Sequence, residues 1–342
     1  MKYVIILLFL LHIFLRFYQL ESRLIFTYDQ LDSAWAAKRI LVDHIYPLLG
    51  PGNKLGSGIF IGPAYYYLIS VVYFFTDLNP IAAGIFAGLT SILNFWVIYY
   101  ITKALFSKQV VIIALFVHTI AFSSITFDRT QWEINFIPSV SLIFFYLLFR
   151  VMNGKIRLIP WLLFVLGTSY HVHLTVAVYL TISLVVTSPL WLRTKETVQK
   201  TLLASPLFLI WLLPIIAGYM QTVGAAAQPL GYASSSFLGI HARRFFQVFS
   251  RDLFIEVGAF FPTWLKLFVV PIFCILYYLQ KRSRSAVYFI LLVILWFVIP
   301  PAVLSVYSGE ITIYYHSATR YVALIVGSYL VWNIWKLKYP LL

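Results

Sequence analysis

The chain has 342 residues, of which 62% are hydrophobic, 19% aromatic and 11% charged. Soluble domains average about 45–50% apolar and about 25% charged residues, so this composition excludes an ordinary soluble globule and indicates a polytopic membrane protein. The net charge of +14 would suit nucleic acid, but the positions of the cations indicate membrane topology instead. The single cysteine, Cys274, excludes an internal disulfide framework and a cysteine-based zinc cluster.

Hydropathy predicts an all-α protein with about ten membrane-spanning helices, because each span needs about 20 mostly apolar residues. The first span, residues 3–15, has no small-residue cleavage site after it and is expected to be an uncleaved signal anchor. The other spans are expected at about 80–102, 109–126, 136–149, 158–170, 174–192, 201–220, 262–280, 286–305 and 321–335. No internal repeat or appended soluble domain is visible, so residues 1–342 are expected to form one membrane domain.

The apolar segment 61–75 is expected to lie along the outer membrane–water interface or to form a re-entrant segment, without crossing the membrane. With residue 1 in the cytoplasm, this arrangement gives a net charge of +13 inside and +1 outside. If the segment crossed, 18 cations would lie outside and 7 inside, which the positive-inside rule rejects. Large outer loops are then expected at about 21–60, 221–261 and 306–320, and they place almost all acids and histidines on the extracytoplasmic side.

The first outer loop is predicted to carry an amphipathic surface helix from Thr27 to about Ile45, with juxtamembrane character. Asp29 and Asp32 share one face of this helix because they are three residues apart. Two interpretations stay open. The pair could carry chemistry, or Asp29 could be the N-cap and Asp32 an acid in the first turn, where the helix dipole favours negative charge.

A stretch rich in glycine and proline follows, from Pro47 to Pro63, and predicts tight turns and close approach of the backbone. It has no Walker spacing, so nucleotide binding is not expected. The stretch leads into Tyr65, Tyr66 and Tyr67, which could form an aromatic belt at the membrane interface.

The order of these motifs resembles that of the GT-C fold glycosyltransferases that use polyprenyl-phosphate sugars, in the protein-mannosyltransferase and aminoarabinose-transferase-like branch. The resemblance covers roughly the first 180 residues, so 1–200 is expected to be a GT-C-like module and 201–342 a more variable set of helices. It is carried by a signal anchor, Tyr28-Asp29-Gln30 with Asp32, Gly50-Pro51, Gly62-Pro63, the three tyrosines, and Trp132-Glu133-Ile134-Asn135 after the third span.

The resemblance implies that acids at the turn after the third span lie near the donor phosphate or a metal. Asp128, Trp132, Glu133 and Asn135 are therefore expected to line the substrate cleft with the three tyrosines. Related sequences often have Trp-Asn-Pro-Asn here, so Glu133 departs from their pattern. Alternatively, Asp128 and its neighbour Arg129 flank a helix end and pair weakly at the surface.

Two histidines, His171 and His173, follow the next predicted helix. On a helix their side chains would point about 200° apart, which makes a poor two-ligand metal motif. They could be hydrogen-bonded at the interface, or, as the resemblance implies, His173 could contact phosphate or acceptor.

Three arginines in the outer loops are candidates for the donor phosphate. Arg243 and Arg244 could each hold a phosphate through the planar guanidinium, or could bind anionic lipid headgroups on a surface helix that folds over the outer cleft. Arg320 stands at the entrance of the final span, where an arginine is costly without an anion.

Together these features imply an inverting glycosyltransferase that moves a sugar from a polyprenyl phosphate to a hydroxyl of a lipid, glycan or protein. Asp29 is expected to accept the acceptor proton, with Asp32 as its helper. The cations, with His173, are expected to neutralise the phosphate.

The resemblance requires no cofactor beyond the lipid-linked donor, although a divalent metal could take part, and it implies lipid but no nucleic acid as partner. It places the active site outside a prokaryotic plasma membrane. A transporter or flippase for lipid-linked sugars or another anionic substrate is the alternative, but transporters usually show internal repeats.

Overall fold

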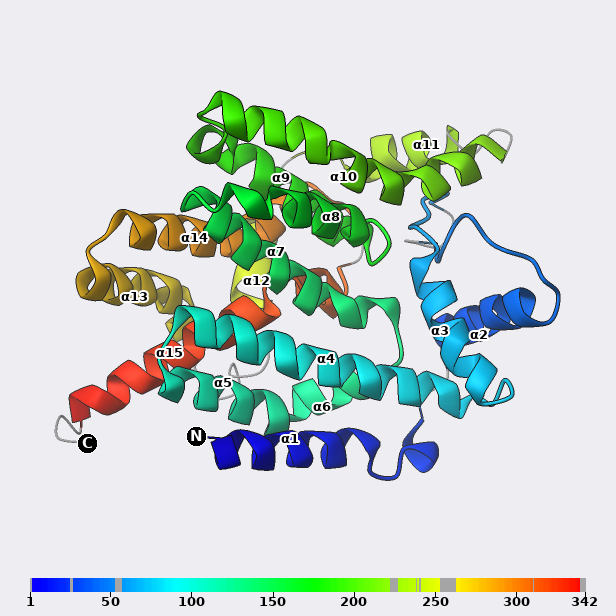
Figure 1. The fold of residues 1–342 in the computed structure, drawn as a ribbon, viewed down its shortest axis with the longest axis horizontal. Coiled ribbons are helices and arrows are strands. Elements are labelled where there is room, and N and C mark those ends of the chain that lie inside the picture. The colour runs from blue at the N-terminus through cyan, green and yellow to red at the C-terminus, as the bar shows by residue number, and fades with distance from the viewer. Residues whose placement is uncertain are drawn as a thin grey trace.

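The computed structural model describes residues 2–24, 27–52, 57–221, 227–237, 239, 241–252, 263–309 and 311–338. Within these ranges the chain is helical, and its β contact is an isolated bridge between Gly52 and Phe60. The predicted all-α class is therefore confirmed for the described part. Long helices run side by side, while α2 (Tyr28–Leu41), α3 (Ala64–Phe75) and α11 (Ala227–Ser236) gather at one end of the bundle (Figure 1).

A helix forms at every place where a span is predicted. The bounds are α1 (Lys2–Phe17), α4 (Ile81–Leu105), α5 (Lys108–Ile120), α6 (Phe122–Arg129), α7 (Ile137–Met152), α8 (Ile159–Ser169), α9 (Leu174–Trp191), α10 (Lys195–Gln221), α13 (Thr263–Lys281), α14 (Arg284–Ser305) and α15 (Arg320–Lys338). A further helix, α12 (Ala242–Asp252), lies in the loop that the sequence predicts at 221–261.

The predicted total of ten spans is not confirmed. Among the described residues five helical segments are long and apolar enough to cross a membrane, and six if the bent pair α5–α6 is one span. The five are Ile81–Leu105, Glu133–Met152, Leu174–Trp191, Lys195–Gln221 and Arg284–Ser305. Helices such as α1, with 16 residues, rise only about 24 Å at 1.5 Å per residue, which is less than the ~30 Å hydrocarbon core.

Helix α3 has 12 residues and so measures only about 18 Å. That length is shorter than one membrane crossing needs, and the expectation that residues 61–75 do not cross stays a prediction. The segment packs on α2 and α4.

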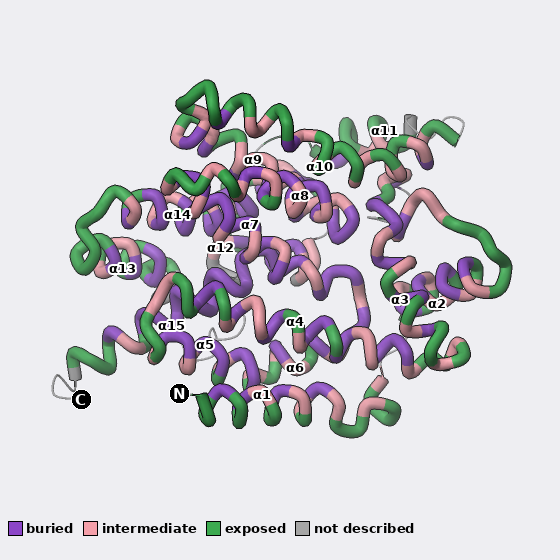
Figure 2. Tube along the Cα trace, viewed as in Figure 1, coloured by how far each residue is buried: buried purple, intermediate pink, exposed green. Residues whose placement is uncertain are grey.

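The buried side chains lie mainly on α4, α5, α7, α14 and α15, whereas α10 and the outer side of α1 are largely exposed (Figure 2). The exposed faces carry large apolar side chains, such as Leu7 and Leu10 on α1 and Leu203 and Ile210 on α10. Extended apolar surfaces of this kind suit contact with lipid.

Candidate functional site

A cavity of about 780 Å³ joins segments that are far apart in the sequence. Its walls come from α2, the glycine-rich stretch and residues 132–134, together with Tyr66, His173, Gln228, Thr312, Tyr314 and Tyr315. Helices α2, α3 and α11, which supply part of this lining, gather at the same end of the bundle (Figure 1).

Helix α2 presents Asp29 and Asp32 to the cavity. Its N-cap is Thr27, which forms a capping box with Gln30 and whose backbone N–H donates to Gln30 Oε1 at 2.8 Å. The interpretation of Asp29 as the N-cap is therefore wrong. Burial, and secondarily the neighbouring charge of Asp32, raises the pKa of Asp29.

Two contacts fix the orientation of α2. The Gln30 amide donates to the backbone carbonyl of Gln131, which ties the helix to the turn before α7. Asp32 accepts a hydrogen bond from the hydroxyl of Tyr66 on α3. The apolar side chains of Leu31 and Trp35 lie on the exposed side of α2, where they suit a membrane surface.

Glu133 is the third acid of the cavity wall. Its side chain is buried, and no described cation lies within 4 Å of it. No lysine or arginine is found among the described lining residues either. Because a buried carboxylate is costly without a counter-charge or a proton, this wall suits a ligand that brings a cation or hydrogen-bond donors.

The glycine-rich stretch forms the opposite rim through close backbone contacts. Gly50 N–H donates to Ile61 O at 2.8 Å, and Gly62 N–H donates to Tyr170 O at 3.0 Å. A Cβ on Gly62 would lie 2.1 Å from His171 Nδ1, so only glycine fits there. The close approach predicted from the glycines is thus found at Gly50 and Gly62.

His171 links two helices through its ring nitrogens. Its Nδ1 accepts from the backbone N–H of Ala64 at 3.2 Å, and its Nε2 lies 2.6 Å from the carbonyl oxygen of Trp211. The ring thereby links the start of α3 to α10. His171 does not line the cavity among the described residues, whereas His173 does.

An aromatic wall consists of Trp132, His173, Tyr314 and Tyr315. Trp132 meets Tyr314 edge to face with ring centroids 5.1 Å apart. His173 meets Tyr314 at 5.4 Å and Tyr315 at 5.7 Å. Such a wall can pack against the apolar face of a sugar ring or a prenyl chain.

Several residues expected in the cleft lie beside it. Tyr65 is buried against Phe86, at 5.7 Å between ring centroids, and the hydroxyl of Tyr67 donates to Pro47 O at 2.9 Å. Asn135 donates its amide to the carbonyl of Thr130 and so shapes the turn. None of these three is among the described lining residues.

The two arginines of α12 do not line the cavity among the described residues. Arg244 donates to the carbonyl oxygens of Tyr307, Ser308 and Gly309, and Arg243 is exposed. Helix α12 packs on α13 and α14 and contributes Val248 to a cluster with Tyr315. It therefore supports the cavity wall from behind.

Asp128 belongs to a separate buried cluster. Its Oδ2 accepts from Arg16 Nε at 3.0 Å and from Arg16 Nη2 at 2.9 Å. Arg16 also donates to the carbonyls of His118 and Thr119 at the end of α5, where the chain bends by 63° into α6. The arginine thus satisfies carbonyls left without helical partners by the bend.

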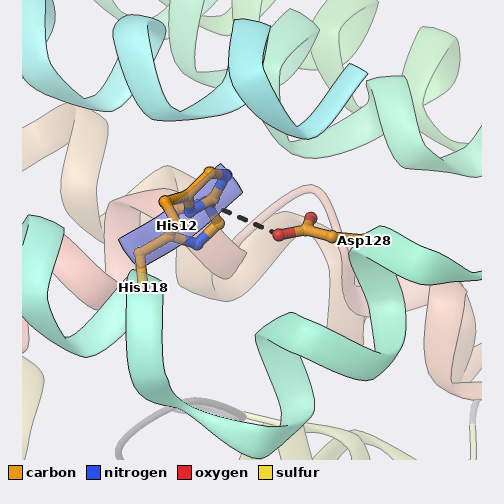
Figure 3. Close-up of side chains that lie close together, drawn as sticks. All are labelled: His12, His118 and Asp128. Atoms are coloured by element: carbon orange, nitrogen blue, oxygen red, sulfur yellow. Dashed lines mark ion pairs between the residues drawn. The ribbon is translucent and has the colours of Figure 1, made fainter. Parts of the chain in front are cut away.

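His12, His118 and Asp128 offer ligand atoms within 4.8 Å of one another and could hold an ion by distance alone (Figure 3). The charge balance opposes this, because Arg16 already pairs with the carboxylate. Two unit charges 4 Å apart interact by about 4 kcal/mol at an effective dielectric of 20, and a divalent cation beside the guanidinium would be repelled by more. We therefore assign this cluster to holding α1 against the bent pair.

Arg320 serves the same bend from the other end of the chain. It is buried, donates to Ser123 O at 3.0 Å, and places its guanidinium 4.1 Å from the centroid of the Phe127 ring. Arg129 donates to the carbonyl of Leu15 in the last turn of α1 and to those of Tyr18 and Gln19 just after it. The expected weak surface pairing of Asp128 with Arg129 is wrong, because Asp128 pairs with Arg16 in the interior.

The sequence interpretation missed Tyr314, Tyr315 and Gln228 in the cavity lining and Arg16 in the interior. A signal for Arg16 was available. His12 and Arg16 are four residues apart in an apolar helix and share one face. For the tyrosines no comparable signal exists, because aromatic residues near helix ends are common in membrane proteins.

No protein-family model matches the chain, and no curated protein does. Two solved structures of an oligosaccharyltransferase from Archaeoglobus fulgidus do resemble it. The first, in complex with zinc and sulfate, shares 12% identity over 98% of this chain and 50% of its own, with a TM-score of 0.53. The second, AglB with an inhibitory peptide and a dolichol-phosphate, shares 10% identity over 99% and 51%, with a TM-score of 0.56.

These likenesses establish a GT-C-like fold. The chain spans about half the length of the oligosaccharyltransferases. The resemblance to the mannosyltransferase and aminoarabinose-transferase branch stays a prediction.

Proposed function

We propose that the protein is a membrane glycosyltransferase of GT-C type that moves a sugar from a polyprenyl-phosphate donor to a hydroxyl acceptor. The observation that carries this proposal is a cavity that is lined both by Asp29, Asp32 and Glu133 and by the aromatic wall. A neighbour with the same fold was solved with a dolichol-phosphate and a peptide, which supports a lipid-linked donor and a separate acceptor.

In the proposed reaction Asp29 is the general base. As the acceptor oxygen attacks the anomeric carbon from the face opposite the phosphate, its proton passes to the Asp29 carboxylate. The bond from the anomeric carbon to the phosphate oxygen breaks, and its electron pair leaves with the polyprenyl phosphate. Asp32, held by Tyr66, orients the acceptor hydroxyl. The raised pKa of Asp29 makes it a better proton acceptor once ionised.

The leaving phosphate needs positive charge, which the described lining does not supply. Arg320 and Arg244 donate to backbone carbonyls, so the structure gives no support for their expected role at the phosphate. Three carboxylates are oxygen ligands of the kind that Mg²⁺ and Mn²⁺ prefer, commonly shared with a substrate phosphate. Among the described residues, however, Asp29, Asp32 and Glu133 do not form a group whose ligand atoms all lie within 4.8 Å of one another. The structure therefore gives no support for an ion held by all three acids.

The test is to incubate the purified protein with a panel of polyprenyl-phosphate sugars, with and without Mg²⁺ or Mn²⁺, and to measure released polyprenyl phosphate. We expect release with at least one donor. Reconstituted vesicles distinguish a glycosyltransferase from a flippase, because a flippase would move the intact donor across the bilayer without releasing the polyprenyl phosphate.

We also propose that the cavity faces the extracytoplasmic side of a plasma membrane. The support is the charge partition of the sequence and the end-on position of the cavity. In a Cys274→Ser background, a cysteine introduced by Ser107→Cys should resist an impermeant thiol reagent added to intact cells. A matched cysteine from Ser22→Cys, in the first outer loop, should react. The reverse labelling pattern would show that the topology is opposite to the one proposed.

A further inference from the structure

The His173 ring begins α9 and is hydrogen-bonded in a way that fixes its proton. Its Nδ1 accepts from the backbone N–H of Thr175 at 3.2 Å and lies against the Thr175 hydroxyl. A backbone N–H can only donate, so Nδ1 must carry a lone pair. The proton of the neutral ring is therefore on Nε2.

The burial of the ring also keeps it uncharged. Only 4% of the residue's surface is exposed, and burial lowers its pKa to about 4. Protonating Nδ1 would break the N-cap of α9 as well as charge a buried group. At neutral pH His173 therefore supplies no positive charge to a phosphate.

The other ring nitrogen, Nε2, has no hydrogen-bond partner among the described residues. His173 lines the cavity together with the three acids. The acids Asp29, Asp32 and Glu133 all carry oxygen acceptors. His173 thus adds a neutral N–H donor to a lining that is otherwise rich in acceptors.

We propose that His173 positions the transferred sugar by donating from neutral Nε2–H to one of its oxygen atoms, while Nδ1 caps α9. This inference rests on the proposed function, because it needs a sugar in the cavity. The neighbouring Trp132 and Tyr314 rings provide the surface against which the sugar ring packs. His173 is a specificity-determining residue in this proposal, and no proton is transferred to or from it.

Two substitutions at His173 distinguish the role of Nδ1 as the cap acceptor from that of Nε2 as the donor to the sugar. In His173→Asn the amide oxygen can replace Nδ1 as the cap acceptor, but no donor reaches the position of Nε2. In His173→Gln the longer amide can place an N–H near the position of Nε2, but the cap is weakened. Removing one well-placed donor from an active site costs about 10²- to 10³-fold in rate for an oxyanion site, and a sugar contact should cost less, about 10- to 100-fold.

We expect His173→Asn to keep the parent melting temperature, to lose about 10- to 100-fold in kcat/KM for the donor, and to keep its pH profile. His173→Gln should melt at a lower temperature but transfer sugar within about threefold of the parent. His171→Gln, at the structural histidine, serves as the control for general disturbance of this turn. Transfer by His173→Asn within threefold of the parent, or equal loss in both His173 variants, would overturn the proposal.

A second measurement does not depend on turnover. The ¹⁵N NMR shifts of labelled histidine, assigned to His173 by loss of its signals in His173→Asn, distinguish a protonated from an unprotonated ring nitrogen. We expect Nε2–H and unprotonated Nδ1 from pH 8 to pH 5. A ring that titrates near 6.5 would refute the inference. If the unsubstituted protein shows this tautomer but releases no polyprenyl phosphate from any donor, the proposed function is refuted instead.

Discussion

The substitution Asp29→Asn separates catalysis from stability at the centre of the proposed site. A general base contributes roughly 10²- to 10⁴-fold to the rate, or about 3 to 5 kcal/mol of barrier. Asparagine keeps the shape of aspartate but cannot accept the acceptor proton. We therefore expect the variant to bind donor and to lose sugar transfer by a factor in that range.

The expected change in stability is small and follows from the structure. Because Thr27 is the N-cap, Asp29→Asn leaves the cap intact and removes only a favourable interaction with the helix dipole, typically 0.3–1 kcal/mol. The raised pKa of Asp29 works in the opposite direction. A folded-state pKa above the unfolded value means that the ionised carboxylate costs stability at neutral pH, and that stability is gained as pH falls through the raised pKa. Asparagine removes this cost.

The assay measures released polyprenyl phosphate against pH, together with thermal unfolding in detergent. The parent rate should fall as pH drops through the raised pKa of Asp29, because the protonated acid cannot act as base. Asp43→Asn is the matched control, since Asp43 lies just after α2 and pairs with Lys38 at the surface. A folded Asp29→Asn protein that transfers sugar within about threefold of the parent would refute the mechanism.

Two other predictions concern the framework around the cavity, and both are checked by thermal unfolding in detergent. Gly62→Ala should destabilise the protein by more than 1 kcal/mol, because the new Cβ meets the His171 ring. Gly231→Ala is the control and should not destabilise the protein, because its Cβ meets nothing within 4 Å. Equal melting temperatures of the two variants would contradict this prediction. Arg16→Met should cost about 3 to 5 kcal/mol, because it leaves the buried Asp128 carboxylate unpaired. Adding Asp128→Asn should restore part of that loss, and no restoration would show that the carbonyl contacts of Arg16 dominate.

The sequence predicted the helices well because their signal is local. Runs of apolar residues mark the long helices, and the glycines at 50 and 62 mark close backbone contacts that the structure shows. The acids Asp29 and Asp32 could be placed on one helix face from their spacing alone. The N-cap could not be assigned from residue preferences, because Thr27 and Asp29 are both good caps and only the Thr27–Gln30 pair decides between them.

The contacts of the arginines show why ion pairs between distant parts of the chain cannot be predicted from the sequence. Arg320 and Asp128 each suggest a ligand when considered alone, since an isolated charge in a membrane domain needs a counter-charge. In the structure Arg16, 112 residues from Asp128 in the sequence, is the partner of that acid. No spacing rule connects them, because the pairing depends on how α1 packs against α5 and α6.

The bend between α5 and α6 is held from both ends of the chain, by Arg16 of α1 and Arg320 of α15. Helices enter the membrane in order during synthesis, so the Arg16 contacts can form early, while the contact of Arg320 with the Ser123 carbonyl forms only after α15 has been made. The bent pair of a nascent chain would therefore be held from one side only until residue 320 has been synthesised. Such a chain should be a substrate for membrane quality control, and shortening it before residue 320 should reduce its cellular abundance even if the residues of the cavity wall up to His173 are intact.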